Sequence, residues 1–330
     1  MRKWLFGLGF IWLFPCLVSL ICMRAAAAGE QRQEADTLLG AARIPTGQEE
    51  DSDIVPEDDQ EQISRRIILE RDGIRTYMEL EDYLPGVVAC QIGSGHEAAT
   101  LQCQAVIART YIRRLMGQRG EINEEELDLD YLSDMQALSA GQDELALRLS
   151  DCREAVQATR GVVMKYEDQF ILPLFHEMSA GRTRTGDAQF PYLQSVDSSS
   201  DCEKENYLQT CTWSREEFAA LINALSLSAP IATAQLAEQI QTVSRDDAGY
   251  MMEIKIGAHT YSGEEVQYAL GLASPCFTIS GDEAGVRVTV RGRGHGYGLS
   301  QAGADAMARQ GWEYTDILRY YYKNISLIFE

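Results

Sequence analysis

The chain has 330 residues, of which 45% are hydrophobic, and carries a formal net charge of −21 at pH 7. This length and composition are typical of a globular protein with one large or two medium domains. The negative charge argues against binding to nucleic acid or to anionic lipid, because both require clustered lysine and arginine. Any affinity for an acidic polymer must come from local contacts rather than from the overall field.

The amino terminus, residues 1–28, predicts an export signal. Arg2 and Lys3 precede an apolar run from Trp4 to Met23, and small residues follow at Ala26 to Ala28. That layout is typical of a secretory signal with an A-x-A cleavage pattern. An uncleaved membrane anchor is the alternative, because the run has roughly the 20 residues needed to cross a bilayer. The sequence leaves secretion and anchoring open, but both place the rest of the chain outside the membrane.

Residues 29–62 are rich in Glu, Asp and Gln, with GQEEDSDIVPEDDQEQ as their centre. They hold too little apolar surface to offset the entropy of ordering a chain, so we expect a disordered acidic linker. The folded part should begin near Ile63.

The first half of the folded part predicts a hairpin followed by helices. RRIILE and GIRTYM alternate as strands around Asp72-Gly73, which is a strong hairpin signal. Apolar residues at three- and four-residue spacing predict helices over 80–92, 98–116 and 143–159. The acidic stretch 121–133 is expected to be a loop.

The second half predicts more strands. Residues 162–184 indicate a hairpin whose second strand delivers His176 into a loop. Helices are expected over 213–224 and 233–240, strands over 250–256 and 285–290, and a final helix with the Tyr320 to Tyr322 cluster. Because helices and strands mix without a βαβ rhythm, the predicted fold class is α+β, with mixed helices and antiparallel strands.

Six cysteines lie beyond the export signal. In an exported protein Cys202 with Cys211, and Cys90 with Cys103, are the expected disulfide pairs, and buried free thiols are the alternative. There is no C-x-x-C spacing, which excludes a zinc ribbon.

Two glycine-containing motifs stand far apart in the chain. The first is YLPGVVACQIGSGHEAATLQCQAVIARTY, residues 83–111, and the second is GRGHGYGLSQAG, residues 292–303. The glycines around His295 permit a close approach of a ligand or another strand. Ser300 and Gln301 open a helical run of small residues.

With PYLQSVDS at residues 191–198, these motifs resemble the stage II sporulation protein D and LytB amidase-enhancer family, in family order over about residues 63–330. The resemblance implies one SpoIID/LytB-like domain there, peptidoglycan glycan strands as the ligand, and a role in sporulation. It further implies lytic transglycosylase chemistry on strands stripped of stem peptides, no cofactor, and a cell-wall amidase such as stage II sporulation protein P as a partner.

The family's catalytic glutamate aligns with Gln91 in this chain. A lytic transglycosylase needs a carboxylic acid that protonates the glycosidic oxygen and then takes a proton back, which an amide cannot do. The activity is therefore in doubt. One alternative is an active enzyme that uses another carboxylate, such as Glu97, if the loop 93–95 folds inward. Another is a structural component of a sporulation complex without sugar binding.

The resemblance assigns further residues to the ligand site, although each histidine alone is as well explained by a structural role. The substrate-binding candidates are Arg109, Tyr111, His176, Ser179, Thr183, His295, Ser300 and Gln301. Tyr192, Trp213 and Trp312 are candidates for stacking on sugars, or else for the core. No metal site is expected, because residues 129–141 lack the His and Cys that zinc-binding members carry there.

Overall fold

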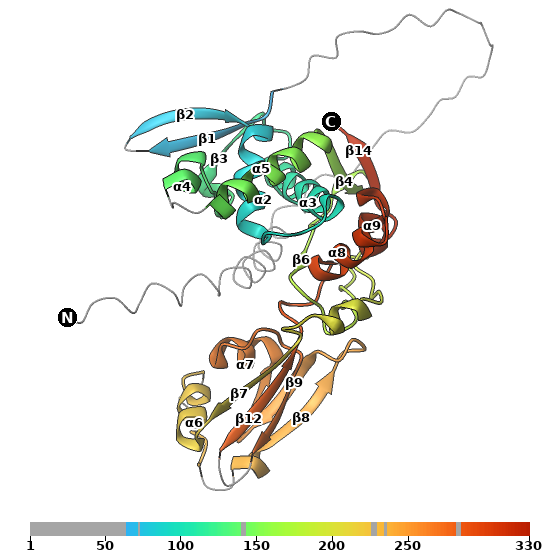
Figure 1. Cartoon of the computed structure of the whole chain (residues 1–330). Coiled ribbons are helices and arrows are strands. Elements are labelled where there is room, and N and C mark those ends of the chain that lie inside the picture. Colours follow the sequence, from blue (N-terminus) through green and yellow to red (C-terminus); the bar gives the residue numbers. More distant parts are fainter. Residues whose placement is uncertain (1–63, 72, 140–142, 226–229, 234–235, 282–284) are drawn as a thin grey trace, which may run out of the picture.

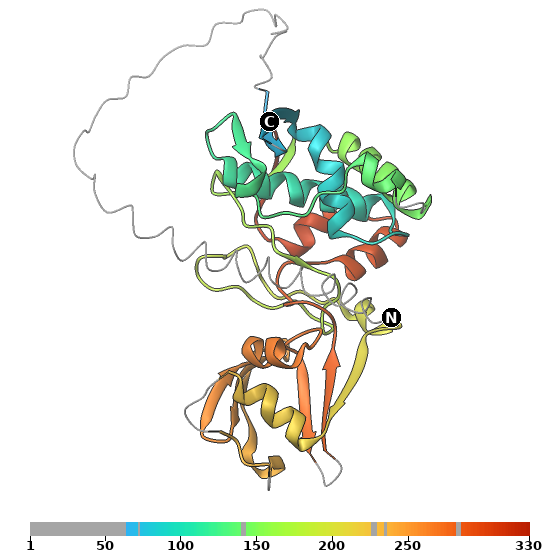
Figure 2. The ribbon, with the colours of Figure 1, turned by 90° about the vertical axis from the view of Figure 1, so that its left-hand side faces the viewer.

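The computed structural model describes residues 64–71, 73–139, 143–225, 230–233, 236–281 and 285–330. These residues form an upper body rich in helices and a lower body rich in strands, joined by extended segments (Figure 1). Figure 2 shows the same two bodies from the side. The predicted export signal and acidic linker lie outside the described residues. In the part described, no helix is long and apolar enough to cross a membrane.

The upper body starts with the predicted hairpin of β1 (Arg66–Arg71) and β2 (Ile74–Glu79). Arg71 pairs with Ile74, and Gly73 adopts a positive φ of 75° in the turn between them. The expectation of a loop over 121–133 was wrong at its start. There β3 (Glu121–Asn123) pairs in parallel with β1, and a 3-10 turn over Glu124–Glu126 follows.

Helices α2 (Leu80–Gln91), α3 (Ala98–Met116) and α5 (Asp143–Ala158) confirm the sequence prediction, and the short α4 (Asp134–Ser139) precedes α5. Their apolar faces pack into one core, which includes Val87, Leu101 and Leu149. Helix α5 buries Leu149, Cys152 and Val156, and it packs against α2 and α3.

The end of the chain returns to the upper body. There β14 (Ser326–Phe329) pairs with β4 (Val162–Tyr166), which also pairs with β5 (Gln169–Phe170). Helices α8 (Gln301–Arg309) and α9 (Tyr314–Tyr321) close a second core with α3. Tyr321 and Tyr322 are buried in this core, and Tyr320 is half-buried.

The predicted hairpin over 162–184 was only partly right. The β4–β5 hairpin forms, but His176 lies on a separate strand, β6 (Phe175–His176), which pairs in parallel with β13 (Leu299–Ser300). This pairing brings together two segments, 175–176 and 299–300, that are more than 120 residues apart in the sequence.

The lower body is an insertion between β6 and β13. One sheet has the order β11-β12-β7 and the other β10-β9-β8. The strands are β7 (Leu208–Trp213), β8 (Ile240–Arg245), β9 (Met251–Ile256), β10 (His259–Ser262), β11 (Phe277–Gly281) and β12 (Val286–Arg291). The helices α6 (Arg215–Asn223) and α7 (Gly263–Leu270) complete its core.

Two helix predictions in the lower body need correction. Trp213 ends a strand, because the N-cap Ser214 starts α6 with a capping box to Glu217. The helix expected over 233–240 is a 3-10 turn at Leu236–Gln239, and residues 234–235 lie outside the described residues. The mixed α+β class is confirmed, with antiparallel pairing in most of the sheets.

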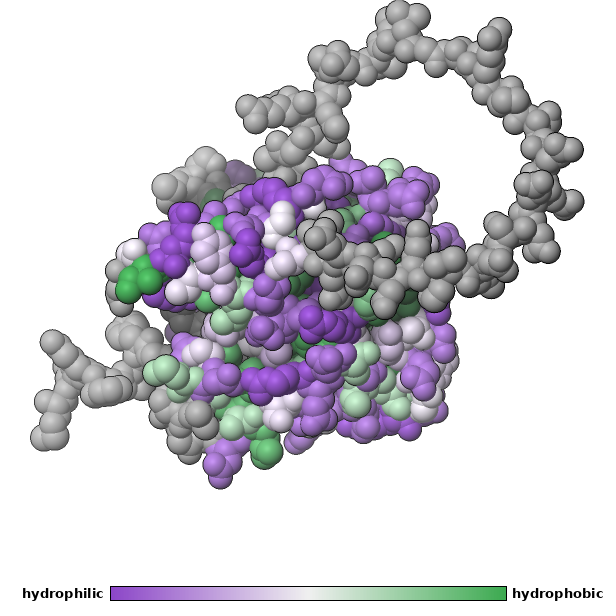
Figure 3. Space-filling view, turned by 90° about the horizontal axis from the view of Figure 1, so that it is seen from above, coloured by the Kyte–Doolittle hydropathy of each residue, from purple (hydrophilic) through white to green (hydrophobic). Residues whose placement is uncertain are grey.

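The six cysteines of the described residues are all free, so neither expected disulfide forms. Cys103, Cys152 and Cys276 are buried, as small apolar side chains are. Seen from above, the described surface is mainly hydrophilic, and its apolar residues lie in small separate patches (Figure 3).

Candidate functional site

Gln91 lies at the end of α2 in a cluster of three amides, which we call the glutamine cluster: Gln91, Gln104 and Gln301. Gln91 Oε1 accepts a hydrogen bond of 2.8 Å from Gln104 Nε2. Gln301 Nε2 donates to the Gln91 carbonyl at 2.9 Å and to Gln104 Oε1 at 3.1 Å. Gln104 and Gln301 are buried, whereas Gln91 is half-buried. The cluster joins α2, α3 and α8 without any titratable group.

One turn further along α8, Asp305 holds the loop between α2 and α3. Its buried carboxylate accepts from the Glu97 backbone N–H at 2.9 Å and from Arg309 at 2.8 Å, with His96 at 3.5 Å. Burial alone would raise the pKa of Asp305, but the hydrogen bonds from His96 and Glu97 and the nearby cations outweigh it. The pKa falls to about 2. Asp305 is therefore an ionised anchor at neutral pH.

The loop between α2 and α3 brings Glu97 to α8, but the contact with Asp305 is made by the Glu97 backbone N–H. Glu97 is the N-cap residue of α3, its side chain is 49% exposed, and its carboxylate pairs with Arg309 at 3.4 Å. The carboxylate thus faces a cation at the surface.

A carboxylate that the sequence did not single out lies next to the cluster. Glu177 follows His176, and its carbonyl accepts from the Ala302 N–H at 3.0 Å, one residue beyond Gln301. Its side chain pairs with Arg293 at 3.2 Å. The Glu177 side chain is 51% exposed, and its pKa is raised by partial burial against the charges of Arg293 and His96. Its place directly after the motif histidine was the available signal.

The two motif histidines, His176 and His295, lie close together, with ring centroids 5.7 Å apart. His176 Nδ1 lies 3.1 Å from the Tyr297 carbonyl, which only accepts, so Nδ1 carries the proton. His295 Nδ1 accepts from the Tyr297 N–H at 3.0 Å. In the described part of the chain, neither buried Nε2 has a hydrogen-bond partner.

Both histidines are neutral at neutral pH. Burial lowers the pKa of His176 to about 4. Burial and the neighbouring His176 lower the pKa of His295 to about 3. Neutral imidazoles accept and donate hydrogen bonds at once, which suits hydroxyl-bearing ligands.

Ser179 and Ser300 are tied to a second buried acid, Asp201, which the sequence analysis also missed. Asp201 Oδ2 accepts from the Ser179 N–H at 2.8 Å and from the Ser300 hydroxyl at 2.7 Å. The Ser300 hydroxyl also accepts from the Gly303 N–H and so caps α8. Burial raises the pKa of Asp201, and these hydrogen bonds oppose the rise. The two serines therefore hold the loop and the helix start together.

Comparison with known proteins identifies the family. The family model described as stage II sporulation protein (SpoIID) matches residues 71–166. Over 263 residues the chain is 31% identical to stage II sporulation protein D of Bacillus amyloliquefaciens, covering 75% of this chain and 74% of that protein. The chain belongs to the stage II sporulation protein D family. This membership supports a sporulation-related role.

Two further relatives match. Stage II sporulation protein D of Bacillus subtilis strain 168 is 29% identical over 263 residues, with the same coverage. An uncharacterized protein of Brachyspira hyodysenteriae is 27% identical over 258 residues, covering 76% of this chain and 67% of that protein.

Three residues that the family resemblance assigned to the ligand site lie apart from the glutamine cluster. Arg109 makes a two-pronged ion pair with Glu81 at 2.7 and 2.8 Å and is 1% exposed. The Tyr111 hydroxyl approaches the Leu127 carbonyl at 3.5 Å. Thr183 accepts from the Val196 N–H at 2.9 Å. These contacts hold neighbouring segments of the fold together.

The stacking candidates divide between core and surface. Tyr192 is buried with its hydroxyl bonded to the Leu172 N–H, so it belongs to the core. Trp312 is 40% exposed. Among the described residues there is no group of three or more His, Cys, Asp or Glu side chains arranged for a metal ion.

Proposed function

We propose that this chain is an exported, wall-facing protein, secreted or membrane-anchored, that binds peptidoglycan glycan strands in sporulation. In this proposal its lytic transglycosylase activity is absent or strongly reduced. The observation that carries the proposal is the glutamine cluster at the position of the family's catalytic glutamate.

Amide side chains suit sugar binding but not proton transfer. Each amide offers two donors and an oxygen acceptor, which matches the hydroxyl and acetamido groups of amino sugars. Gln91 is the half-buried member and so reaches the surface, while Gln104 and Gln301 fix its orientation from below. The neutral histidines and the serine loop would add further hydrogen-bonding groups nearby.

Cleavage would require an acid that the glutamine cluster does not contain. Loss of general acid–base catalysis by itself costs about 10²–10⁴-fold in rate. The ionised Asp305 cannot supply the proton at neutral pH, since its pKa is about 2.

The alternative of an active transglycosylase rests on another carboxylate. Ion pairing does not separate Glu97 from Glu177, because both side chains are about half exposed and each pairs with an arginine. Glu177 is the better candidate, because its pKa is raised and its backbone is bonded to the start of α8 beside Gln301.

The test incubates the full chain and its variants with stem-peptide-free glycan and measures anhydro-muramyl products. We expect the unaltered protein to bind glycan with little product, and Gln91→Glu to raise cleavage by about 10²-fold or more. Glu177→Gln is the matched control and should change nothing. Rapid cleavage by the unaltered protein that Glu177→Gln abolishes would instead establish the enzyme alternative.

A structural role without sugar binding is separated by retention on the same glycan. Loss of retention in Gln91→Ala, which removes the half-buried member, with unchanged thermal unfolding, supports binding at the cluster. No retention of the unaltered protein would favour the structural role. In the proposed function a cell-wall amidase, such as stage II sporulation protein P, is the partner that supplies stripped strands.

A further inference from the structure

A basic cavity of about 670 Å³ lies at the far end of α3 from the glutamine cluster. Its walls come from the C-terminal half of α3, the β4–β5 hairpin and Glu330. Arg113 stands nine residues after Gln104, which is about 14 Å along the helix axis and half a turn around it. The cavity is therefore separate from the glutamine cluster.

The cavity is positively charged in an acidic protein. Four cationic side chains (Arg65, Arg113, Arg114 and Lys165) line it against two carboxylates (Asp168 and Glu330). This local excess of positive charge runs against the net charge of −21. Crowding of like charges is unfavourable unless an anion offsets it. Burial and the charge of Arg113 lower the pKa of Arg65, which reflects this crowding.

The Glu330 side chain shows what the cations are arranged to hold. Arg113 donates to Glu330 Oε2 from Nε at 2.9 Å and from Nη2 at 2.6 Å, and Lys165 reaches Oε1 at 3.0 Å. The Arg113 side chain is only 6% exposed, so this geometry is built into the fold. Although burial alone would raise the pKa of Glu330, these partners lower it. Each oxygen of a carboxylate thus has its own cationic partner.

Phe170 holds the two cations in place. The Arg113 guanidinium lies 5.1 Å and the Lys165 ammonium 4.6 Å from the centre of the ring. Arg114 is fixed by donating to the Phe170 carbonyl at 2.7 Å. Cations ordered before binding lose less entropy when an anion arrives.

We propose that this cavity binds a carboxylate of an acidic glycan, which replaces the Glu330 side chain on Arg113 and Lys165. The inference rests on the proposed function, because removal of a stem peptide hydrolyses an amide and leaves a free carboxylate on the sugar. Stripped strands carry this group and intact strands do not. The cavity therefore gives the protein a means to recognise stripped strands by the carboxylate that the sugar itself carries.

The experiment measures binding of the full chain to stripped glycan and to the same glycan with its carboxyl groups converted to neutral methylamides. We expect about tenfold tighter binding of the acidic form, with the advantage shrinking as salt rises. Lys165→Gln should remove most of this advantage and leave binding of the neutral form unchanged. Glu330→Gln should strengthen binding of the acidic form, because the competing carboxylate is gone.

Arg319→Gln is the matched control, since Arg319 is an exposed arginine on α9 outside the cavity. It should not alter the preference. Equal affinity for the acidic and neutral glycans, or a preference that survives Lys165→Gln, would overturn the inference while the proposed function stands. Absence of binding to either glycan would reject both.

A phosphate polymer presents a similar oxyanion, so poly(glycerol phosphate) forms a third arm. Tighter binding of this polymer than of the acidic glycan, lost in Lys165→Gln, would assign the cavity to phosphate and reject the carboxylate proposal.

Discussion

At the scale of single residues, burial keeps the two motif histidines neutral by lowering their pKa. His176 is 3% exposed and bonded only through Nδ1, so its charged form would lose hydration without gaining an acceptor. The sequence identified both histidines from their motifs, but not their tautomers. Those depend on the Tyr297 backbone, which the fold brings to His176 from 121 residues away.

The depressed pKa of His176 predicts a pH-dependent stability. Between pH 6.5 and about 4 the unfolded chain binds a proton at this residue and the folded chain does not. The free energy of unfolding should therefore fall with falling pH, by about 1.4 kcal/mol per unit for this histidine. In His176→Asn the amide still donates to Tyr297, but this part of the slope should vanish. Urea unfolding across this range measures it, and an unchanged slope would contradict the assignment.

Residues missed by sequence analysis share a cause. Glu177 and Asp201 gain meaning only from partners far along the chain, such as Ala302 for the first and Ser300 for the second. Gln91, in contrast, was found because its neighbours in the sequence carry the family pattern.

At the scale of elements, α8 organises the site. Gln301, Asp305 and Arg309 follow each other at four-residue spacing and so form one row on this helix. The row meets Gln91, the Glu97 backbone and the Glu97 side chain in turn. Periodicity predicted α2, α3 and α5 well, because long amphipathic helices have a strong local signal. The two-residue strands β6 and β13 have no such signal, and their pairing was not predicted.

Gly303 is the residue that lets α8 pack. A Cβ there would overlap the hydroxyl groups of Tyr321 and Ser198. Alanine improves helix propensity by about 1 kcal/mol, so Gly303→Ala would stabilise an exposed helix. Here we expect overpacking to dominate, with a net loss of about 1–3 kcal/mol in the free energy of unfolding. Thermal unfolding measures this loss. A raised melting temperature would contradict the expectation and mean that α8 can move enough to accommodate the added methyl group.

At the scale of the whole molecule, two segments, residues 177–207 and 292–298, connect the upper body to the lower body. Met178 and Arg293 exchange backbone hydrogen bonds of 3.0 and 2.7 Å, and the Arg184 N–H donates to the Gly296 carbonyl at 2.8 Å. The sequence patterns predicted α+β elements in this region, but they did not indicate that the residues between β6 and β13 form a separate body. That organisation depends on which strands pair, and pairing across such a distance leaves little trace in local periodicity.

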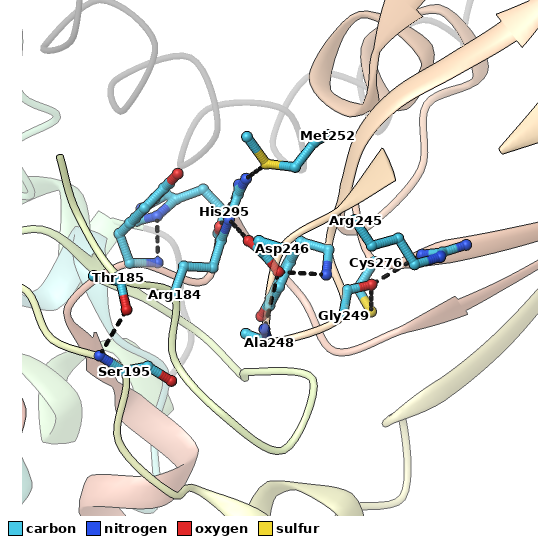
Figure 4. Close-up of polar contacts among 12 residues, drawn as sticks. Arg184, Thr185, Ser195, Arg245, Asp246, Ala248, Gly249, Met252, Cys276 and His295 are labelled. Atoms are coloured by element: carbon cyan, nitrogen blue, oxygen red, sulfur yellow. Dashed lines mark hydrogen bonds and ion pairs between the residues drawn. The ribbon is translucent and has the colours of Figure 1, made fainter. Parts of the chain in front are cut away.

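Arg184 fastens the lower body to these segments (Figure 4). It is 1% exposed, donates to Asp246 at 2.6 Å and Glu264 at 2.7 Å, and lies 4.5 Å from the centre of the Tyr297 ring. Asp246 lies between β8 and β9, and Glu264 belongs to α7. The Arg184 guanidinium therefore ties two parts of the lower body to the connecting segment that carries Arg184.

Arg184→Gln should therefore loosen the lower body selectively. Loss of the cation leaves two neighbouring carboxylates without their partner. We expect a destabilisation of about 2–3 kcal/mol, somewhat below the usual cost for a buried pair because both acids keep some exposure. Hydrogen exchange should speed up in β8, β9 and α7 but not in α2 or α3. The exposed neighbour Arg182 provides the control, as Arg182→Gln should leave exchange unchanged. Equal acceleration in both bodies would mean that Arg184 supports the whole fold rather than the junction.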